Sequence, residues 1–246
     1  MLQVTLIQID NYGPWTTTPL PKKEAYLQGL QAGIYRTLQK KFSMKKALVF
    51  PMRYDNLLAI TNGMDEKAHR TILDQLKYKF PVSLSMSVAT GKTPYEAQAN
   101  ATRRLSREGG AKHAHRKSVL AIDGLSDDPL SIAHADIDSI TAHTDSNVYD
   151  SYVRVVSTGQ SLTNLLAPYG ALVFYMGGDN FIIPCGNAGK KEFLEIFKAI
   201  EQESGVGLKA GIGSGRNAEA AVGRASMGLK KIRLGAMEKV VEYNED

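Results

Sequence analysis

The chain contains two copies of one sequence pattern, and this duplication constrains its fold more than any other feature. LVFPMRYDNLLAI at 48–60 corresponds to LVFYMGGDNFIIP at 172–184, so Asp55 and Asp179 occupy the same point of the pattern, 124 residues apart. Two further matches are 88–92 with 212–216 at the same offset, and Asp10 with Asp136 at an offset of 126. Repeats at nearly one offset indicate a tandem duplication. We therefore expect two halves with one fold.

Hydrophobic periodicity gives each half the same order of elements. In the first half we expect a strand at 2–9, a helix at 22–42, strands at 47–52 and 56–61, a helix at 64–79, a strand at 82–89 and a helix at 94–107. In the second half we expect a strand at 131–137, a helix at 146–166, a hairpin at 171–184, a helix at 190–204, a strand at 206–212 and a helix at 217–233. The βαββαβ order predicts an α+β chain of two tandem ferredoxin-like or palm domains, each an antiparallel sheet with helices on one face.

The boundaries between the halves follow from composition. We expect an N-terminal palm-like domain at 1–107, a connector at 108–130 rich in Gly, Ser, His and charge, and a C-terminal palm-like domain at 131–246. One short helical turn is expected in the connector, around 117–122.

Composition restricts the classes of partner. The chain has 246 residues with 43% hydrophobic and 22% charged, which is ordinary for a globular protein. Its net charge of +5 favours anionic partners, and nucleotide phosphates satisfy it without a nucleic acid. A single cysteine, Cys185, excludes an internal disulfide and multi-cysteine zinc motifs. The sequence shows neither a signal-peptide pattern nor an apolar run of membrane-spanning length, so we expect a cytoplasmic protein that binds no membrane.

Four aspartates suggest metal chemistry. Asp10 follows an apolar strand and Asp55 lies in the next hairpin, while Asp136 and Asp179 repeat this arrangement in the second half. Because the first strand of such a sheet lies beside the hairpin, the acids of each pair can converge. Paired carboxylates repel unless a cation lies between them, and Mg²⁺ is the hard cation that prefers oxygen ligands. The alternative is that they are ordinary strand-end and turn acids.

Other residues near these acids could bind a nucleotide. Two glycines, Gly177 and Gly178, precede Asp179 and allow a ligand to approach the backbone closely. The strand-to-helix loops at 11–15 and 137–141 offer backbone N–H groups to phosphates. Basic residues of the last helix are candidate phosphate ligands, although surface Lys and Arg often only solvate a helix; they are Lys230, Lys231 and Arg233. His134 is the histidine nearest the second acid pair.

These motifs resemble known families. Ala135-Asp136-Ile137 with GGDNF at 177–181 resembles the palm domain of GGDEF diguanylate cyclases and class III nucleotidyl cyclases. The whole chain is similar to the archaeal GTP cyclohydrolase III family, through QIDNYGPWT at 8–16, ITNG at 60–63, TPYEAQ at 93–98, GGDNF and KAGIGSGR at 209–216.

The resemblance implies an enzyme that opens the imidazole ring of GTP and releases two phosphates. The implied product is 2-amino-5-formylamino-6-(5-phospho-D-ribosylamino)pyrimidin-4(3H)-one, used early in flavin and deazaflavin coenzyme synthesis. It implies two Mg²⁺ ions per site, GTP as substrate and a homo-oligomer. The implied catalytic metal ligands are Asp10, Asp55, Asp136 and Asp179. The implied further cofactor-binding residues are Asn11, Asn56, Ile137, Gly177, Gly178, Asn180 and Lys230.

The base-reading residues of the cyclases do not carry over. Their positions fall on Thr144 and Val153, and Asn147 and Asp150 are nearby substitutes. A nucleotidyl cyclase and a non-catalytic GTP-binding regulator therefore stay open as alternatives at this point.

Overall fold

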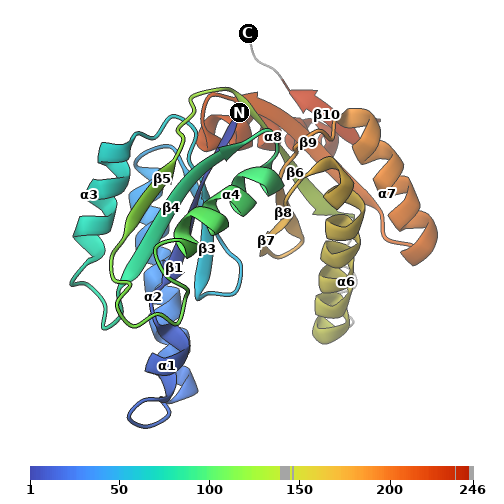
Figure 1. The fold of residues 1–246 in the computed structure, drawn as a ribbon. Coiled ribbons are helices and arrows are strands. Elements are labelled where there is room, and N and C mark those ends of the chain that lie inside the picture. The colour runs from blue at the N-terminus through green and yellow to red at the C-terminus, as the bar shows by residue number, and fades with distance from the viewer. Residues whose placement is uncertain (139–144, 146, 236, 244–246) are drawn as a thin grey trace. The chain divides into compact units, whose positions relative to one another are not determined.

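Two five-stranded sheets, one in each half of the chain, form the framework of the structure (Figure 1). The computed structural model describes residues 1–138, 145, 147–235 and 237–243. Two compact units result: the first comprises Met1–Lys92, Glu96–Asp128 and Asn217–Glu219, and the second comprises Thr93–Tyr95, Pro129–Arg216 and Ala220–Asp246. The expected α+β fold of two tandem palm-like units is confirmed.

The first sheet has the strand order β2-β3-β1-β4-β5. Its strands are β1 Leu2–Ile9, β2 Leu48–Pro51, β3 Asn56–Ile60, β4 Leu84–Gly91 and β5 Leu120–Asp123. Its helices are α1 Tyr12–Thr17, α2 Glu24–Ser43, α3 Glu66–Leu76 and α4 Pro94–Ser106. Helices α2 and α3 share one core with the sheet, in which Ile7, Leu38 and Leu73 are buried. Helix α4 packs on the opposite face. It lies so close to β4 that a Cβ at Gly91 would collide with Ala97.

The second sheet has the order β10-β9-β6-β8-β7. Its strands are β6 Leu130–Ile137, β7 Phe174–Gly177, β8 Asn180–Pro184, β9 Leu208–Gly215 and β10 Val240–Tyr243. Its helices are α6 Val148–Leu166, the 3₁₀ turn η1 Ala167–Tyr169, α7 Lys190–Ser204 and α8 Ala218–Arg233. Helices α6 and α7 bury Leu162 and Phe197 in the core on one face. Helix α8 covers the other face, where a Cβ at Gly211 would collide with its backbone.

Three details differ from the sequence expectation. Each sheet is mixed, since β5 runs parallel to β4 and β10 runs parallel to β9. Strand β5 lies inside the segment 108–130, which the sequence predicts as the connector. The prediction of a helical turn around 117–122 is therefore wrong. Helices also cover both faces of each sheet. The sequence patterns predict neither β5 nor β10. Each has four residues and lies at a sheet edge, so its local pattern is too short to reveal a partner far away in the sequence.

The strand register relates the two halves residue by residue. Gln8 lies opposite Asn56, and Asp136 lies opposite Asn180. Because Asn56 and Asn180 are equivalent at the offset of 124, Asp136 corresponds to Gln8. The backbone agrees, since the N–H of Asp10 donates to Ser83 and the N–H of Asp138 donates to Gly207. The first strands are therefore related by an offset of 128, and the alignment of Asp10 with Asp136 is wrong by two residues.

Candidate active site

Asp136 and Asp179 form an acidic pair in the second unit. Asp136 lies near the end of β6 and is 3% exposed, while Asp179 is half-buried in the turn between β7 and β8. The negative charge of Asp136 acts on the carboxyl group of Asp179, so the two acids belong to one site. Burial and then the negative charge of Asp136 raise the pKa of Asp179. The structure therefore brings these two predicted residues together.

The two oxygens of Asp136 have different surroundings. Oδ2 accepts hydrogen bonds from Arg233, at 2.6 Å from Nη2 and 3.2 Å from Nε, and lies 3.4 Å from Lys209 Nζ. Oδ1 is buried and has no hydrogen-bond partner among the described residues. An unsatisfied buried carboxylate oxygen is costly, and a divalent cation would both satisfy it and separate the like charges. The pair therefore fits a Mg²⁺ ion.

Additional ligands would have to come from other sources. Within the described ranges, no group of three or more His, Cys, Asp or Glu side chains could hold a metal ion. Backbone carbonyls, phosphate oxygens and water remain as donors of the type that Mg²⁺ accepts. Ile137, one of the expected cofactor-binding residues, directly follows Asp136 and is buried. Its N–H donates to the carbonyl oxygen of Asp179 at 3.3 Å.

The glycines of the hairpin serve its backbone conformation. Gly177 has φ of 103° and Gly178 has φ of 61°, values that other L residues adopt with strain. A Cβ at Gly177 would meet no atom within 4 Å, so the space beside this turn is open. The hydroxyl of Tyr175 donates to the carbonyl of Gly178 at 3.2 Å and fastens the turn.

A chain of polar contacts leads from α8 to the acidic pair. Asn180 Nδ2 donates to Asp179 Oδ1 at 2.9 Å, and Asn180 Oδ1 lies 2.9 Å from His134 Nε2. His134 Nδ1 lies 2.9 Å from the hydroxyl of Ser226. Burial lowers the pKa of His134, which favours the neutral ring. His134, the histidine that the sequence placed near the pair, is thus linked to it through Asn180.

Sequence reasoning missed Lys209 and Asp138. Lys209 Nζ lies 2.8 Å from Asp138 Oδ1, in addition to its contact with Asp136. Burial lowers the pKa of Lys209, but the hydrogen bond to Asp138 and the charges of both acids outweigh it and raise the pKa above its ordinary value. Lys209 lies directly opposite Asp136 in the β6–β9 register, and only a strand pairing could have revealed this.

The basic residues of α8 divide into two kinds. Arg233, half-exposed, contacts Asp136 and is the member of the predicted set that reaches the pair. Lys230 is exposed, and its side chain has no hydrogen bond or ion pair within the part of the chain that the structure describes. Lys231 Nζ lies 4.5 Å from the ring centroid of Tyr243.

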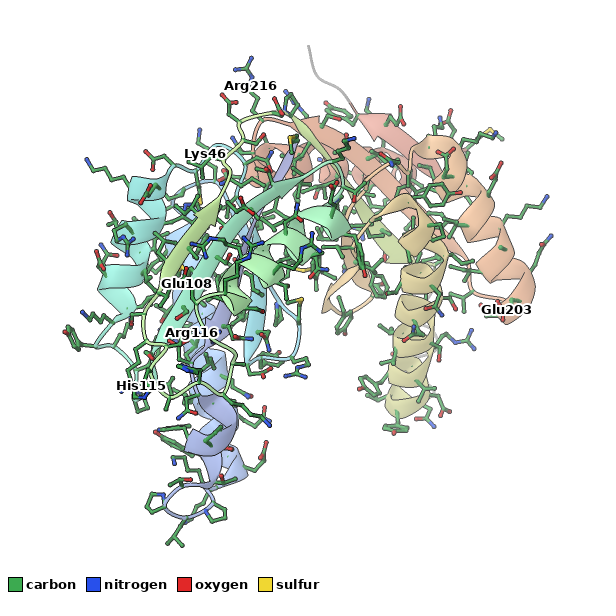
Figure 2. The ribbon with its side chains drawn as sticks, in the orientation of Figure 1. Lys46, Glu108, His115, Arg116, Glu203 and Arg216 are labelled. Carbon is green, nitrogen blue, oxygen red and sulfur yellow. The ribbon has the colours of Figure 1, made fainter. Side chains whose placement is uncertain are left out.

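In the first unit a buried arginine, Arg116, which Figure 2 labels, lies beside the end of the first strand. Asp10 Oδ1 accepts from buried Arg116 at 2.8 Å, and Arg116 also donates to Gln8 Oε1 at 2.6 Å. The other oxygen of Asp10 accepts from the hydroxyls of Ser83 and Ser85 and the N–H of Ser118. Both oxygens of Asp10 are therefore satisfied by protein donors, and a buried guanidinium supplies the positive charge.

Asp55 is engaged separately from Asp10. Its Oδ2 lies 2.7 Å from Nη2 of Arg53, an exposed residue at the position of Gly177. Asn56 accepts from Gln8 Nε2 at 2.6 Å, and Asn11 has a left-handed backbone with its N–H donating to Ala111. The structure does not bring Asp10 and Asp55 together as an open pair.

Two pockets border the second unit's helix α6. One is lined by Asp150, Val153, Arg154, Ser157, Thr158, Ser161, Ser204 and Val206. The other is more apolar and is lined by Tyr152, Val155, Val156, Gly159, Gln160, Thr163, Val173, Tyr175 and Phe181. Asn147 caps α6 by accepting from two backbone N–H groups. Thr144 and residues 139–141 of the expected phosphate loop lie outside the described residues.

None of the helices among the described residues is both long and apolar enough to cross a lipid bilayer.

Comparison with known proteins gives matches over nearly the whole chain. A family model described as GTP cyclohydrolase III matches residues 2–246. The chain is 47% identical over 239 residues to GTP cyclohydrolase III of Methanobrevibacter smithii, covering 95% of this chain and 94% of that protein. It is 47% identical over 238 residues to the protein of the same name from Methanothermobacter thermautotrophicus, covering 96% of each chain. Among solved structures it is similar to a bacterial light-regulated adenylyl cyclase, with a TM-score of 0.37, 12% identity and coverage of 98% of this chain and 85% of that one.

Proposed function

The chain belongs to the GTP cyclohydrolase III family, and from this premise we propose that it opens the guanine imidazole ring of GTP at the Asp136–Asp179 pair. The proposed product is the formylamino-pyrimidinone ribosyl monophosphate with two inorganic phosphates, an early intermediate of flavin and deazaflavin coenzymes. One water is consumed at the ring carbon between the two imidazole nitrogens, and one for each phosphate released. The observation that carries this assignment is the buried, unpartnered Oδ1 of Asp136 beside a second carboxyl group.

Asp136 and Asp179, with the backbone carbonyl of Ile137, are the proposed ligands of Mg²⁺. When bound there, Mg²⁺ would neutralise negative charge on the triphosphate and increase the acidity of water. The two-ion stoichiometry expected from the sequence stays a prediction.

Arg233 and Lys209 supply positive charge from the chain itself. Both contact Oδ2 of Asp136, which leaves Oδ1 unpaired. Arg233 is half-exposed at the end of α8, so its guanidinium can donate to phosphate oxygens, for which its planar fork is well suited. Lys230, one turn of helix earlier and exposed, is the second proposed phosphate ligand.

Of the two pockets on α6, the one lined by Asp150 and Arg154 is the proposed site of the guanine base. Asp150 and Arg154 both line it and are separated by one helical turn. Guanine presents N–H donors on its Watson–Crick edge, which suit a carboxylate, and O6 and N7 acceptors, which suit a guanidinium. Val206 lines the pocket and precedes Gly207 in the chain. The carbonyl of Gly207 accepts a hydrogen bond from the N–H of Asp138, two residues after Asp136.

One such centre per chain follows from the contrast between the units. In the first unit, Gln8 replaces Asp136, and Arg116 provides the charge that a cation provides in the second. We therefore propose that Asp10 and Asp55 do not ligate the catalytic metal, in contrast to the sequence expectation. A cytoplasmic location, a homo-oligomer and the absence of nucleic-acid and membrane partners remain parts of this proposal.

The test uses purified protein, GTP and Mg²⁺, followed by ultraviolet absorption and a phosphate assay. We expect loss of the purine spectrum with two phosphates per GTP, and a loss of turnover of about 10³-fold or more in Asp179→Asn. Asp55→Asn is the matched control at the equivalent hairpin position, and its activity should stay within about threefold. Pyrophosphate release with an intact purine spectrum would instead indicate a cyclase, and equal losses in both variants would contradict a single centre.

A further inference from the structure

The polar chain from Ser226 to Asp179 has one consistent set of donors and acceptors. The amide nitrogen of Asn180 faces Asp179 Oδ1 at 2.9 Å and donates to it, because a carboxylate only accepts. The amide oxygen of Asn180 is then the acceptor that faces His134. His134 Nε2 must therefore carry the proton.

The far end of the imidazole follows from this assignment. With the proton on Nε2, neutral His134 has an unprotonated Nδ1, which accepts from the hydroxyl of Ser226 at 2.9 Å. Ser226 on α8 thus fixes the plane of the ring, and the ring in turn fixes the amide of Asn180. Rotating this amide by 180° would place its oxygen against the carboxylate of Asp179, where both groups are negative or partly negative.

The first unit contains the same asparagine without the histidine. Asn56 Oδ1 also accepts a hydrogen bond, at 2.6 Å, but its donor is Gln8, the residue that corresponds to Asp136. When this position is an aspartate, it cannot donate to the asparagine. The donor in the second unit comes instead from His134, where the first unit has Leu6. The histidine therefore occurs in the unit that has the acidic pair and supplies the donor that the pair removes.

We propose that His134 is a positioning residue of the acidic pair, acting through Asn180. By holding the Asn180 amide, it keeps one oxygen of Asp179 bound and leaves the other free of this contact for a divalent cation. This inference rests on the proposed function, because it assumes that the pair binds a metal. Outer contacts of this kind typically change metal affinity by about 10- to 100-fold.

Mn²⁺ binding to the full chain without nucleotide, measured by electron paramagnetic resonance, tests the inference without recourse to activity. His134→Leu, which installs the first unit's residue, should raise the Mn²⁺ dissociation constant by about tenfold or more. His134→Gln retains an N–H donor and should restore affinity to within about threefold. Ser131→Ala is the control. It removes a partly buried hydroxyl of the same strand, whose oxygen lies 2.8 Å from the hydroxyl oxygen of Ser214, and it should leave Mn²⁺ affinity unchanged.

A double-mutant cycle protects the test against a folding defect in one variant. Asn180→Ala should weaken Mn²⁺ binding to a similar extent as His134→Leu, and the double variant should lose little more, because both changes break one chain. Additive losses, or unchanged Mn²⁺ affinity in His134→Leu, would overturn the inference. Mn²⁺ affinity that depends on His134 in a chain that leaves the purine ring of GTP intact would support the positioning role and refute the ring-opening function.

Discussion

The two units share one strand register but differ in how they treat polar groups. In the first unit, Gln3, Thr5, Thr61 and His69 are fully buried and bonded to one another or to nearby backbone, as in the 2.8 Å contact between Thr5 and His69. The residues at the corresponding positions of the second unit are Ser131, Ala133, Cys185 and Phe193.

The difference reverses at the end of the first strand. There Arg116 and three serines satisfy both oxygens of Asp10 in the first unit, while Asp136 in the second unit has a carboxylate oxygen with no donor among the described residues. A duplicated fold has thus kept internal polar bonding in one copy and an unsatisfied acidic site in the other. Buried polar groups that are fully bonded favour a unique fold, whereas an unsatisfied buried oxygen near the end of a strand, such as Oδ1 of Asp136, favours a ligand.

The largest expected contrast is between Asp136 and Asp10. Asp136→Asn should reduce turnover by about 10³-fold or more, because a metal contributes several kcal/mol to transition-state stabilisation. Its unfolding free energy should change little, since Arg233 is half-exposed and retains water. Steady-state kinetics and urea unfolding measure the two effects.

Asp10→Asn should show the opposite behaviour. Arg116 is 1% exposed at its side chain and would lose its charged partner, which typically costs about 3–5 kcal/mol in unfolding free energy. Mn²⁺ affinity of the fraction that folds should be unchanged. If Asp10→Asn instead lost Mn²⁺ binding with unchanged stability, the first unit would contain a metal centre and the comparison would fail.

The packing of the last helix distinguishes the units next. Strand β9 presents Gly211, Gly213 and Gly215 to α8, whereas the corresponding residues of β4 are Ser87, Ala89 and Gly91. A Cβ at Gly211 would collide with the backbone of Ala225 and Leu229, so Gly211→Ala should lower the unfolding free energy by about 3 kcal/mol or more.

Gly223→Ala in the same helix is the control for this change. A Cβ there would meet nothing within 4 Å, and the gain in helix propensity should stabilise the chain by about 0.5–1 kcal/mol. Equal unfolding free energies for the two alanine variants would show that α8 does not pack closely against Gly211, Gly213 and Gly215 of β9.

His69 should make the first unit sensitive to acid. Burial lowers the pKa of His69 below its ordinary 6.5. Below that value the unfolded chain binds a proton that the folded chain does not, so stability falls as the pH drops from 6.5 towards the folded pKa. Urea unfolding at pH 7.5 and 5.5 should show a loss of about 1 kcal/mol that His69→Gln lacks. An identical pH dependence in the variant would assign the acid sensitivity elsewhere.

The smallest expected effect is a gain. The hydroxyl of Ser87 is buried and has no hydrogen-bond partner within the described residues. Ser87→Ala should therefore raise the unfolding free energy by about 1 kcal/mol, because the desolvation penalty of the hydroxyl is removed. A destabilised variant in the same urea assay would mean that the hydroxyl has a partner.

Sequence patterns predicted most of the elements because their signals are local. Residues such as Leu38 on α2 and Phe197 on α7 recur at helical spacing, and the hairpin with Asp179 repeats the one with Asp55. Strands β5 and β10 escaped prediction, since each has four residues and is defined by parallel pairing with a remote strand. The Asp136–Asp179 pair was predicted as a unit, and its contact with Arg233 was not.

The sequence by itself determined that this protein has two copies of one α+β fold with acids at strand ends and hairpins. Only the tertiary structure decided which acid faces which partner. Side chains of a strand alternate with a period of two, so a shift of two residues leaves the apolar pattern on the same face and cannot be detected from hydrophobicity. The shift nevertheless moves each acid by two residues along the strand ladder. It places Gln8 opposite the first asparagine, Asp136 opposite the second, and Asp10 within reach of Arg116.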